Sequence, residues 1–244
     1  MKSTTVKRVL VTGGSGAIGA AICRHFAVDG MHVIVHANRN LDAAQRLCRE
    51  LRDNGGSAQA IQFDVTDGST TQTALEALLG DGPIQVLINN AGIHDDAVFP
   101  GMQRAQWHSV IDVSLHGFFN VTQPLSMPMI RSRWGRIISI SSIAGITGNR
   151  GQTNYAAAKG ALHAASKSLA LELATRGITV NVVAPGIISS DMTKDVFDST
   201  AIETLVPMKR AGKPEEVAAL VGFLASDSAA YITGQVISVN GGMV

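Results

Sequence analysis

Seven short apolar segments, rich in β-branched residues, recur along the 244-residue chain and are separated by longer segments with a helical pattern. The strand candidates are RVLVT near Val9, HVIVH near Val33, AQAIQF near Ile61, IQVLIN near Leu87, RIISIS near Ile138, ITVNVV near Val180 and QVISVN near Ile237. Helical patterns, such as 17–29 and 41–54, lie between them. Strands that alternate with helices predict βαβ units and a parallel sheet buried on both faces.

Right-handed crossovers between such strands give a doubly wound, Rossmann-type α/β fold, here with a seven-stranded parallel sheet. No linker rich in Pro, Gly or Ser and no internal repeat interrupts the series, so we expect a single domain over residues 1–244. Ligands of this fold bind at the carboxyl ends of the strands. The loops that follow the strands are therefore the place to look for chemistry.

Charge and composition exclude several classes of protein. The net charge is +1 and no block of Lys or Arg occurs, so we expect no nucleic-acid partner. The N-terminus runs directly into a strand pattern and no segment reaches membrane-spanning length, so we expect a cytoplasmic protein with no membrane partner. Cys23 and Cys48 have no metal-ligand spacing, so we expect reduced thiols and no metal.

The first strand candidate ends in VTGGSGAIG, where Gly14, Gly16 and Gly19 satisfy the pattern G-x-G-x-x-G between a strand and a helix. Glycines at these positions let the backbone turn tightly and approach a pyrophosphate, which then rests on the helix N-terminus. A tight strand-to-helix turn without a ligand is the plain alternative. The context nevertheless favours a dinucleotide site.

The residues after the second strand candidate predict which dinucleotide binds. Folds selective for NAD usually carry an acidic residue there, but this chain has Ala37, Asn38 and Arg39. A guanidinium suits the 2′-phosphate of NADPH, and no carboxylate repels that phosphate. The alternative is that Arg39 is only a solvated loop charge. Asp64 and Val65, at the end of the third strand candidate, are expected near the adenine.

The segment NYAAAKG places Tyr155 four residues before Lys159 in an Ala-rich, helical context. Positions i and i+4 share a helix face, so the phenol and the ammonium should point the same way. On this pair alone, a snorkelling lysine beside an amphipathic tyrosine is a sufficient interpretation.

Several motifs together resemble the short-chain dehydrogenase/reductase family, and the similarity runs through nearly the whole chain. They are TGGSGAIG, NNAG (89–92), Ser142 thirteen residues before Tyr155, Tyr155-x-x-x-Lys159, and PGIISSDM from Pro185. The resemblance is strongest to members that reduce 3-oxoacyl groups on acyl carrier protein. It rests on NRGQTNYAAAKGAL, TRGITVNVVAPG, VPMKRAGKPEEVAALVGFLASDSAAYITGQ and the ending VNGGMV.

The resemblance implies a mechanism for the Tyr155–Lys159 pair. Lys159, as a cation, lowers the pKa of Tyr155 and holds the nicotinamide ribose. Tyr155 then protonates the carbonyl oxygen as hydride arrives, and Ser142 hydrogen-bonds the same oxygen. The alternative for Ser142 is a turn serine that satisfies local backbone, and for NNAG a strand-end turn.

The resemblance also implies the remaining contacts. The cofactor-binding residues are Gly13, Ser15, Gly16, Ile18, Gly19, Arg39, Asp64, Val65, Asn90, Ala91, Gly92, Tyr155, Lys159, Pro185, Gly186, Ile188 and Ser190. Arg133 and Arg176 dock the acyl carrier protein, unless they are scattered solvated charges. Residues 190–208 form a lid over the acyl chain, unless they are a packed surface loop. The family predicts a homotetramer or homodimer.

The sequence departs from the family pattern in three places, the last of which holds two residues. Ala17 replaces the usual glycine before Ile18, and Ser114 stands where most members carry a catalytic asparagine. We expect Ser114 to keep a water-mediated proton relay in altered form, although it could simply cap or bend its helix. Pro124 and Pro128 fall in a helix that usually helps form the dimer, and proline kinks helices.

The leading hypothesis is therefore NADPH-dependent reduction of 3-oxoacyl thioesters on acyl carrier protein. A second hypothesis keeps the chemistry but takes a free alcohol or ketone, such as a sugar or steroid-like compound. A third is a cofactor-binding regulatory protein without catalysis, against which Ser142, Tyr155 and Lys159 argue.

Overall fold

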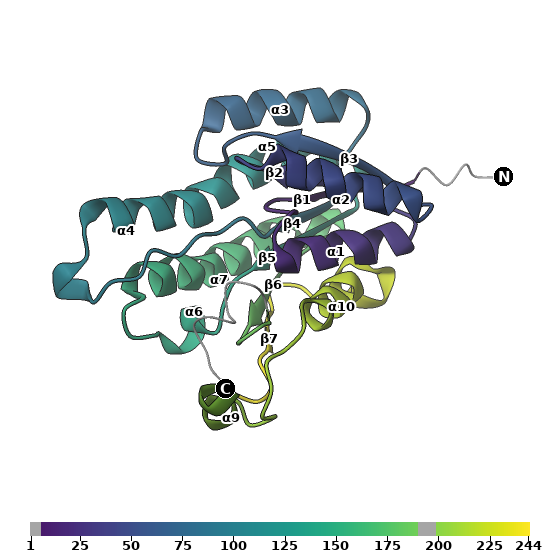
Figure 1. The fold of residues 1–244 in the computed structure, drawn as a ribbon. Coiled ribbons are helices and arrows are strands. Elements are labelled where there is room, and N and C mark those ends of the chain that lie inside the picture. Colours follow the sequence, from purple (N-terminus) through teal and green to yellow (C-terminus); the bar gives the residue numbers. More distant parts are fainter. Residues whose placement is uncertain (1–5, 190–198) are drawn as a thin grey trace.

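One parallel sheet runs through the computed structural model, which describes residues 6–189 and 199–244 (Figure 1). Its strand order is β3-β2-β1-β4-β5-β6-β7, and every neighbouring pair is parallel. The strands are β1 (Arg8–Val11), β2 (His32–Ala37), β3 (Ser57–Gln62), β4 (Val86–Asn89), β5 (Gly135–Ile140), β6 (Ile178–Pro185) and β7 (Val236–Val239). The seven strand segments and the doubly wound fold expected from the sequence are confirmed.

Helices cover both faces of the sheet (Figure 1). One face packs against α1 (Ala17–Val28), α2 (Leu41–Asp53) and α10 (Pro214–Ala225). The other packs against α3 (Gly68–Gly80), α5 (Gly117–Ser132) and α7 (Thr153–Leu173). The shorter helices are α4 (Arg104–Ile111), α6 (Ala144–Thr147) and α9 (Ser199–Leu205), and α9 lies near the C-terminus in Figure 1. Among the described helices, none has the length and apolar character needed to cross a bilayer.

Alternation along each strand divides the core into two layers. Val9 and Val11 of β1 face the layer of α1 and α10, whereas Leu10 faces the layer of α3 and α5. All eight residues of β6 are buried. Burial on both faces is why the strand segments read as continuous apolar runs rather than as alternating patterns.

Helix α5 continues through Pro124 and Pro128 without ending. Side-chain bonds hold this helix to the sheet loops: Asn120 Nδ2 donates to Val65 O at 2.8 Å, and Asn89 Nδ2 donates to Thr122 Oγ1 at 3.0 Å. The prolines therefore do not divide the helix that was expected to contribute to an interface.

The order of the strands fixes where a ligand can bind. The chain winds from β1 outward to β2 and β3, then returns to β4 on the other side of β1. The helices that follow β1 and β4 consequently cover opposite faces of the sheet, and dinucleotides bind at the crevice that this leaves at the carboxyl ends of the two strands. The glycine-rich loop and the NNAG segment are the two loops that meet there.

Candidate active site

The loop after β1 has the backbone geometry of an anion cradle. Gly13 has a φ of +60°, and a Cβ on Gly19 would overlap Gly13 O and lie 2.9 Å from Asn90 Nδ2. Helix α1 begins at Ala17 and has Gly16 as its N-cap, with no side chain capping it. The N–H groups of its first turn therefore have no intrahelical partners and can bind phosphate oxygens. Ala17 lies within the helix and does not disturb the loop.

Thr12 and Asn90 tie this loop to the loop after β4. Asn90 Nδ2 donates to Thr12 O at 2.9 Å and to Gly13 O at 3.0 Å. Thr12 Oγ1 accepts from the N–H groups of Asn90 and Ala91, both at 3.0 Å. The structure thus brings the predicted residues Gly13, Asn90 and Ala91 together. Sequence reasoning missed Thr12, although its place directly before the first glycine is a usable signal.

Arg39 lies exposed just after β2, on the side of the crevice expected to bind the adenosine. The nearby carboxyl of Asp64 has a lowered pKa because Thr66 donates its backbone N–H and hydroxyl to it, with further help from Asn38 and the charge of Arg39. Val65 is buried and packs against Gly117 at the start of α5. Arg39 is therefore an exposed cation at the rim of this end of the crevice.

Tyr155 and Lys159 lie on one face of α7, as their spacing predicted. Lys159 Nζ is 5.7 Å from the centroid of the Tyr155 ring and donates to Ile140 O at 2.9 Å. Ser142, in the loop after β5, accepts from Ala144 N–H at 3.1 Å, and its hydroxyl lies near enough to the Tyr155 phenol to lower the pKa of that group. The three predicted residues of the motif therefore converge from α7 and β5 at the carboxyl edge of the sheet.

Burial is the largest influence on the pKa values of Tyr155 and Lys159. It lowers the pKa of Lys159 to about 8, since the ammonium is 3% exposed. Burial also raises the pKa of Tyr155; the Ser142 hydrogen bond opposes this and the charge of Asp96 adds to it. The expected lowering of the Tyr155 pKa is therefore not what the structure gives. The phenol stays protonated at neutral pH, which is the form a proton donor requires.

Ser114 lies in a π-helical turn, Asp112–His116, between α4 and α5. Its hydroxyl is buried and has no hydrogen-bond partner among the described residues. It lines a cavity of about 10 Å³ together with Thr12, Asn89 and Ala91, about the smallest space that can hold one water. A Cβ on Gly92 would lie 2.9 Å from Lys159 Nζ and 3.8 Å from Ser114 Oγ. Ser114 and Lys159 therefore approach each other beside Gly92.

The loop after β6 closes the site from the other side. Pro185 O accepts from Ile143 N–H, and Gly186 N–H donates to Val239 O, both at 2.9 Å. Ile188 is buried and forms a bridge to Gly212. Ser190 and lid residues 190–198 lie outside the described residues. In the described part of the expected lid, α9 leads to Val206, which is buried against Gly241.

Arg133 and Arg176 lie together, but at the other edge of the sheet. Arg133 ends α5 just before β5, and its NH2 donates to Thr175 O at 3.4 Å. Arg176 lies two residues before β6, which begins at Ile178. Both therefore sit at the amino ends of strands whose carboxyl ends carry Ser142 and Pro185.

Sequence reasoning also missed the groups that hold the Tyr155 helix in place. Asn154 is fully buried; its Nδ2 donates to Asp95 O and Gln106 O at 2.9 and 3.0 Å. Ser141 Oγ donates to Lys159 O at 3.0 Å and lies 2.7 Å from His163 Nε2. Asn154 and Ser141 could have been found by their position next to Tyr155 and Ser142, whereas nothing in the sequence indicates His163.

Within the described ranges, no group of three or more His, Cys, Asp or Glu side chains is placed to hold a metal ion. Cys23 and Cys48 are free and buried. Burial raises the pKa of both thiols. Both are therefore unreactive core residues.

Comparison with known proteins gives the same assignment as the geometry. A family model described as short chain dehydrogenase matches residues 7–201. The chain is 43% identical over 246 aligned residues to a 3-oxoacyl-[acyl-carrier-protein] reductase of Synechocystis sp., covering 100% of this chain and 99% of the relative. It is 42% identical over 244 residues to an acetoacetyl-CoA reductase of Cupriavidus necator, covering 98% of each chain.

A third relative, nodulation protein G of Azospirillum brasilense, is 42% identical over 240 residues, covering 97% of this chain and 98% of the relative. The family match covers most of the chain and contains the glycine-rich loop, Ser142, Tyr155 and Lys159. This chain therefore belongs to the short-chain dehydrogenase family and is an oxidoreductase with a nicotinamide cofactor.

Proposed function

We propose that this protein reduces 3-oxoacyl thioesters carried by acyl carrier protein to 3-hydroxyacyl thioesters, with NADPH as the reductant, in fatty-acid or polyketide-like biosynthesis. The observation that carries the proposal is the convergence of Ser142, Tyr155 and Lys159 beside the crevice between the loops after β1 and β4. The names of the Synechocystis and Cupriavidus relatives both support a 3-oxoacyl thioester as the substrate.

The residues of the chain fit a dinucleotide. Gly13 and Gly19 leave room for close approach, and the unpaired N–H groups at the start of α1 suit its pyrophosphate. When bound, the nicotinamide supplies the hydride. We assign the other cofactor contacts to Ser15, Gly16, Ile18, Asp64, Val65, Asn90, Ala91, Gly92, Pro185, Gly186, Ile188 and Ser190.

Tyr155 is the general acid in this proposal, because its raised pKa keeps the proton on the phenol until a carbonyl oxygen accepts it. Ser142 hydrogen-bonds the same oxygen and holds it next to the phenol. Lys159 holds the nicotinamide ribose and returns a proton to Tyr155. Ser114 passes that proton inward through one water in the adjoining 10 Å³ cavity.

NADPH rather than NADH is proposed because Arg39 is an exposed cation at the rim of the crevice. Arg39→Ala should weaken binding of NADPH about ten- to a hundredfold, with much less effect on NADH, which has no 2′-phosphate. Titration of both cofactors by fluorescence measures this. Equal losses would mean that Arg39 only shapes the loop.

We propose that the carrier protein docks on Arg133 and Arg176; Arg133 donates to the carbonyl of Thr175, the residue directly before Arg176. The six residues of β5 separate these arginines from Ser142 by about 20 Å. Reversing both arginines to Glu should raise the KM for a carrier-linked substrate in a salt-dependent manner and spare a small unlinked substrate. The same reversal at Arg46 and Arg49 of α2 is the matched control.

A homotetramer or homodimer is proposed for assembly. Exposed apolar side chains on two neighbouring helices support it: Phe119 and Met127 of α5 are 63% and 51% exposed, and Leu171 of α7 is 83% exposed. Light scattering on Phe119→Ser and Leu171→Ser should show a loss of assembly.

We also propose that residues 190–208 form a lid over the acyl chain. In the described part, Met208 N–H donates to Gly241 O at 3.1 Å, which fixes the end of the segment next to the C-terminus. Hydrogen exchange across 190–205 should slow when NADPH binds, and unchanged exchange would count against a lid.

The deciding experiment compares NADPH oxidation with one 3-oxoacyl group presented on acyl carrier protein, on coenzyme A and as an unlinked ester. We expect the highest kcat/KM with the carrier. A preference for the coenzyme A thioester would instead favour an activity like that named for the Cupriavidus relative, an acetoacetyl-CoA reductase. Preference for an unlinked ketone would favour a free alcohol or ketone as substrate, and no oxidation of NADPH with any of them would favour a regulatory cofactor-binding role.

A further inference from the structure

His36 is a buried titratable residue next to the glycine-rich loop, and the proposed mechanism does not use it. It is the fifth residue of β2 and is 1% exposed. Its side chain lies at the carboxyl edge of the sheet, between the loop after β1 and the loop after β3. Both loops belong to the proposed cofactor site.

Both nitrogens of the His36 ring are hydrogen-bonded to these loops. Nδ1 accepts from the backbone N–H of Gly13 at 3.1 Å, and Nε2 lies 2.9 Å from Phe63 O. Because Nδ1 accepts, the neutral ring carries its proton on Nε2 and donates it to the Phe63 carbonyl. The ring also packs on Phe63, with centroids 4.1 Å apart.

The backbone of His36 makes a further contact with the same loop, since its carbonyl accepts from Gly14 N–H at 2.8 Å. One residue thus binds the N–H groups of both glycines that begin the loop. Those two N–H groups point inward, toward β2. The N–H groups of the first turn of α1 remain to face a ligand.

The surroundings of His36 keep its ring neutral. Burial lowers its pKa to about 4, although the Phe63 hydrogen bond and the charge of Asp64 act in the other direction. Asp64 is itself paired with Thr66 and faces Arg39. On the α1 side the nearest titratable group is the Cys23 thiol, which is neutral and lies under Gly14. At neutral pH the ring therefore accepts from Gly13 rather than repelling it.

We propose that His36 is a positioning residue for the cofactor. Its ring bridges the backbone N–H of Gly13 and the backbone carbonyl of Phe63, and this bridge fixes the glycine-rich loop in the conformation that binds the pyrophosphate. The inference rests on the proposed dinucleotide site and adds a residue to it. It also joins the pyrophosphate and adenine sides of the crevice, because Phe63 directly precedes Asp64 and Val65.

Two substitutions distinguish the contribution of the Nδ1 hydrogen bond from that of the Nε2 hydrogen bond. His36→Asn keeps an acceptor near the position of Nδ1, facing Gly13, and His36→Gln instead places its amide near the position of Nε2, facing Phe63. His36→Leu removes both. His32→Asn is the matched control, because His32 is the first residue of the same strand and binds Ser57 Oγ at 2.7 Å, at the opposite edge of the sheet.

The experiment is calorimetric titration of NADP⁺ into the five proteins at pH 7.5, with Tm measured for each. We expect the Kd to rise about tenfold in His36→Leu and His36→Gln, and to stay within about threefold of the parent in His36→Asn. His32→Asn should match the parent. With saturating NADPH, kcat should be nearly unchanged while the KM for NADPH rises.

Equal Kd values for His36→Asn and His36→Gln would overturn the inference, as would unchanged binding of NADP⁺ by His36→Leu. If His36→Leu does not fold, the difference in Kd between His36→Asn and His36→Gln still tests the inference. If the parent itself does not bind NADP⁺, the proposed cofactor is wrong. Hydrogen exchange at Gly13 and Gly14 then tests His36 alone: exchange faster in His36→Gln than in His36→Asn supports its hold on the loop, and equal exchange rejects it.

Discussion

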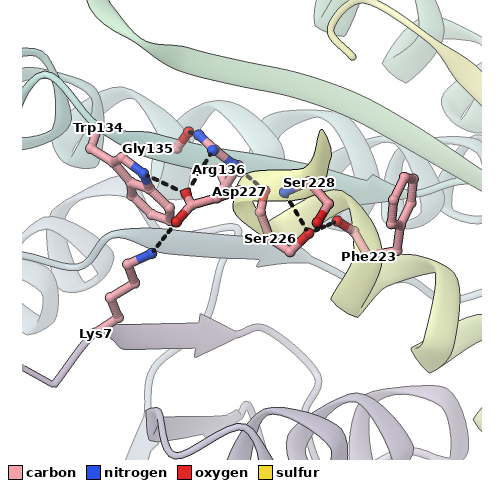
Figure 2. Close-up of polar contacts among 8 residues, drawn as sticks. All are labelled: Lys7, Trp134, Gly135, Arg136, Phe223, Ser226, Asp227 and Ser228. Carbon is pink, nitrogen blue, oxygen red and sulfur yellow. Dashed lines mark hydrogen bonds and ion pairs between the residues drawn. The ribbon is translucent and has the colours of Figure 1, made fainter. Parts of the chain in front are cut away.

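The two edges of the sheet differ in whether a carboxylate pairs with their cations. At the amino edge, Asp227 gathers three donors (Figure 2): Oδ1 accepts from Trp134 Nε1 at 3.2 Å and Arg136 NH2 at 3.4 Å, and Oδ2 lies 3.8 Å from Lys7 Nζ. Lys7 and Arg136 also lie over the Trp134 ring, at 3.8 and 4.3 Å from its centroid. Lys7 and Arg136 are therefore each paired with the Asp227 carboxylate and each packed on the Trp134 ring.

At the carboxyl edge, Lys159 Nζ donates to the Ile140 carbonyl and lies 5.7 Å from the centroid of the Tyr155 ring, but no salt bridge between described residues reaches it. Ser114, next to it, leaves a buried hydroxyl unpaired. A buried polar group without a partner reduces stability. The comparison teaches that a carboxylate pairs with the cations of the amino edge, whereas the buried ammonium of the carboxyl edge has no anion and remains available to the proposed reaction.

The largest expected effect is at the carboxyl edge. Tyr155→Phe keeps the ring but removes the proton, so turnover should fall roughly 10²- to 10⁴-fold with NADPH binding intact. The chain's other tyrosine, Tyr231, is fully exposed, and Tyr231→Phe is the matched control. Near-normal turnover in Tyr155→Phe would end the proposed mechanism.

Lys159→Met should abolish turnover and yet stabilise the fold. With a pKa of about 8 against 10.5 unfolded, Lys159 binds its proton more weakly in the folded state, and this penalty is complete below pH 8. Removing it should stabilise the protein by about 3 kcal/mol at pH 7.

The gain in Tm should shrink as the pH rises from 8 to 10.5, because the lysine is then neutral in both states. Thermal unfolding at several pH values measures it. Lys167→Met, on an exposed position of the same helix, should change Tm little at any pH. A lower Tm for Lys159→Met at pH 7 would show that the buried ammonium does not destabilise the folded protein.

Asp227→Asn should do the reverse at the amino edge. It leaves the buried Arg136 side chain, 3% exposed, without its anion, but the Asp227 carboxylate is 76% exposed and solvent screens the loss. We expect a destabilisation of about 1–2 kcal/mol, measured by denaturant unfolding, with unchanged kcat. A loss of turnover in a folded Asp227→Asn enzyme would break the division between the edges.

The smallest effect is expected at Ser114. Ser114→Ala should lower turnover about tenfold or less, without a change in NADPH affinity or a loss of stability. Ser114→Asn should be active. Ser166→Ala removes another buried, unpaired hydroxyl, away from the site, and should leave turnover unchanged. Normal turnover of Ser114→Ala across the working pH range would remove this residue from proton delivery.

The sequence by itself determined the elements and the motifs that lie within one loop or one helix. The central strands were found because burial on both faces leaves continuous apolar runs. The edge strands β3 and β7 are only partly buried, although both were also found. Tyr155 and Lys159 share a face because helical periodicity places i and i+4 together. The glycine-rich loop was identified because close backbone approach needs glycine, which is visible in the letters alone.

Only the tertiary structure decided what depends on contacts between distant segments and on burial. His36 is hydrogen-bonded to Gly13, 23 positions away in the chain, and to Phe63, 27 positions away, and no local sequence pattern indicates either contact. Ser114 and Lys159 come to lie on either side of Gly92, although 45 positions separate them in the chain, and Ser114 does so within a π-helical turn. The pKa of Tyr155 rises where the motif predicted a fall, since removal of the phenol from water outweighs the hydrogen bond from Ser142. Desolvation is a property of the packed molecule, and a sequence pattern does not contain it.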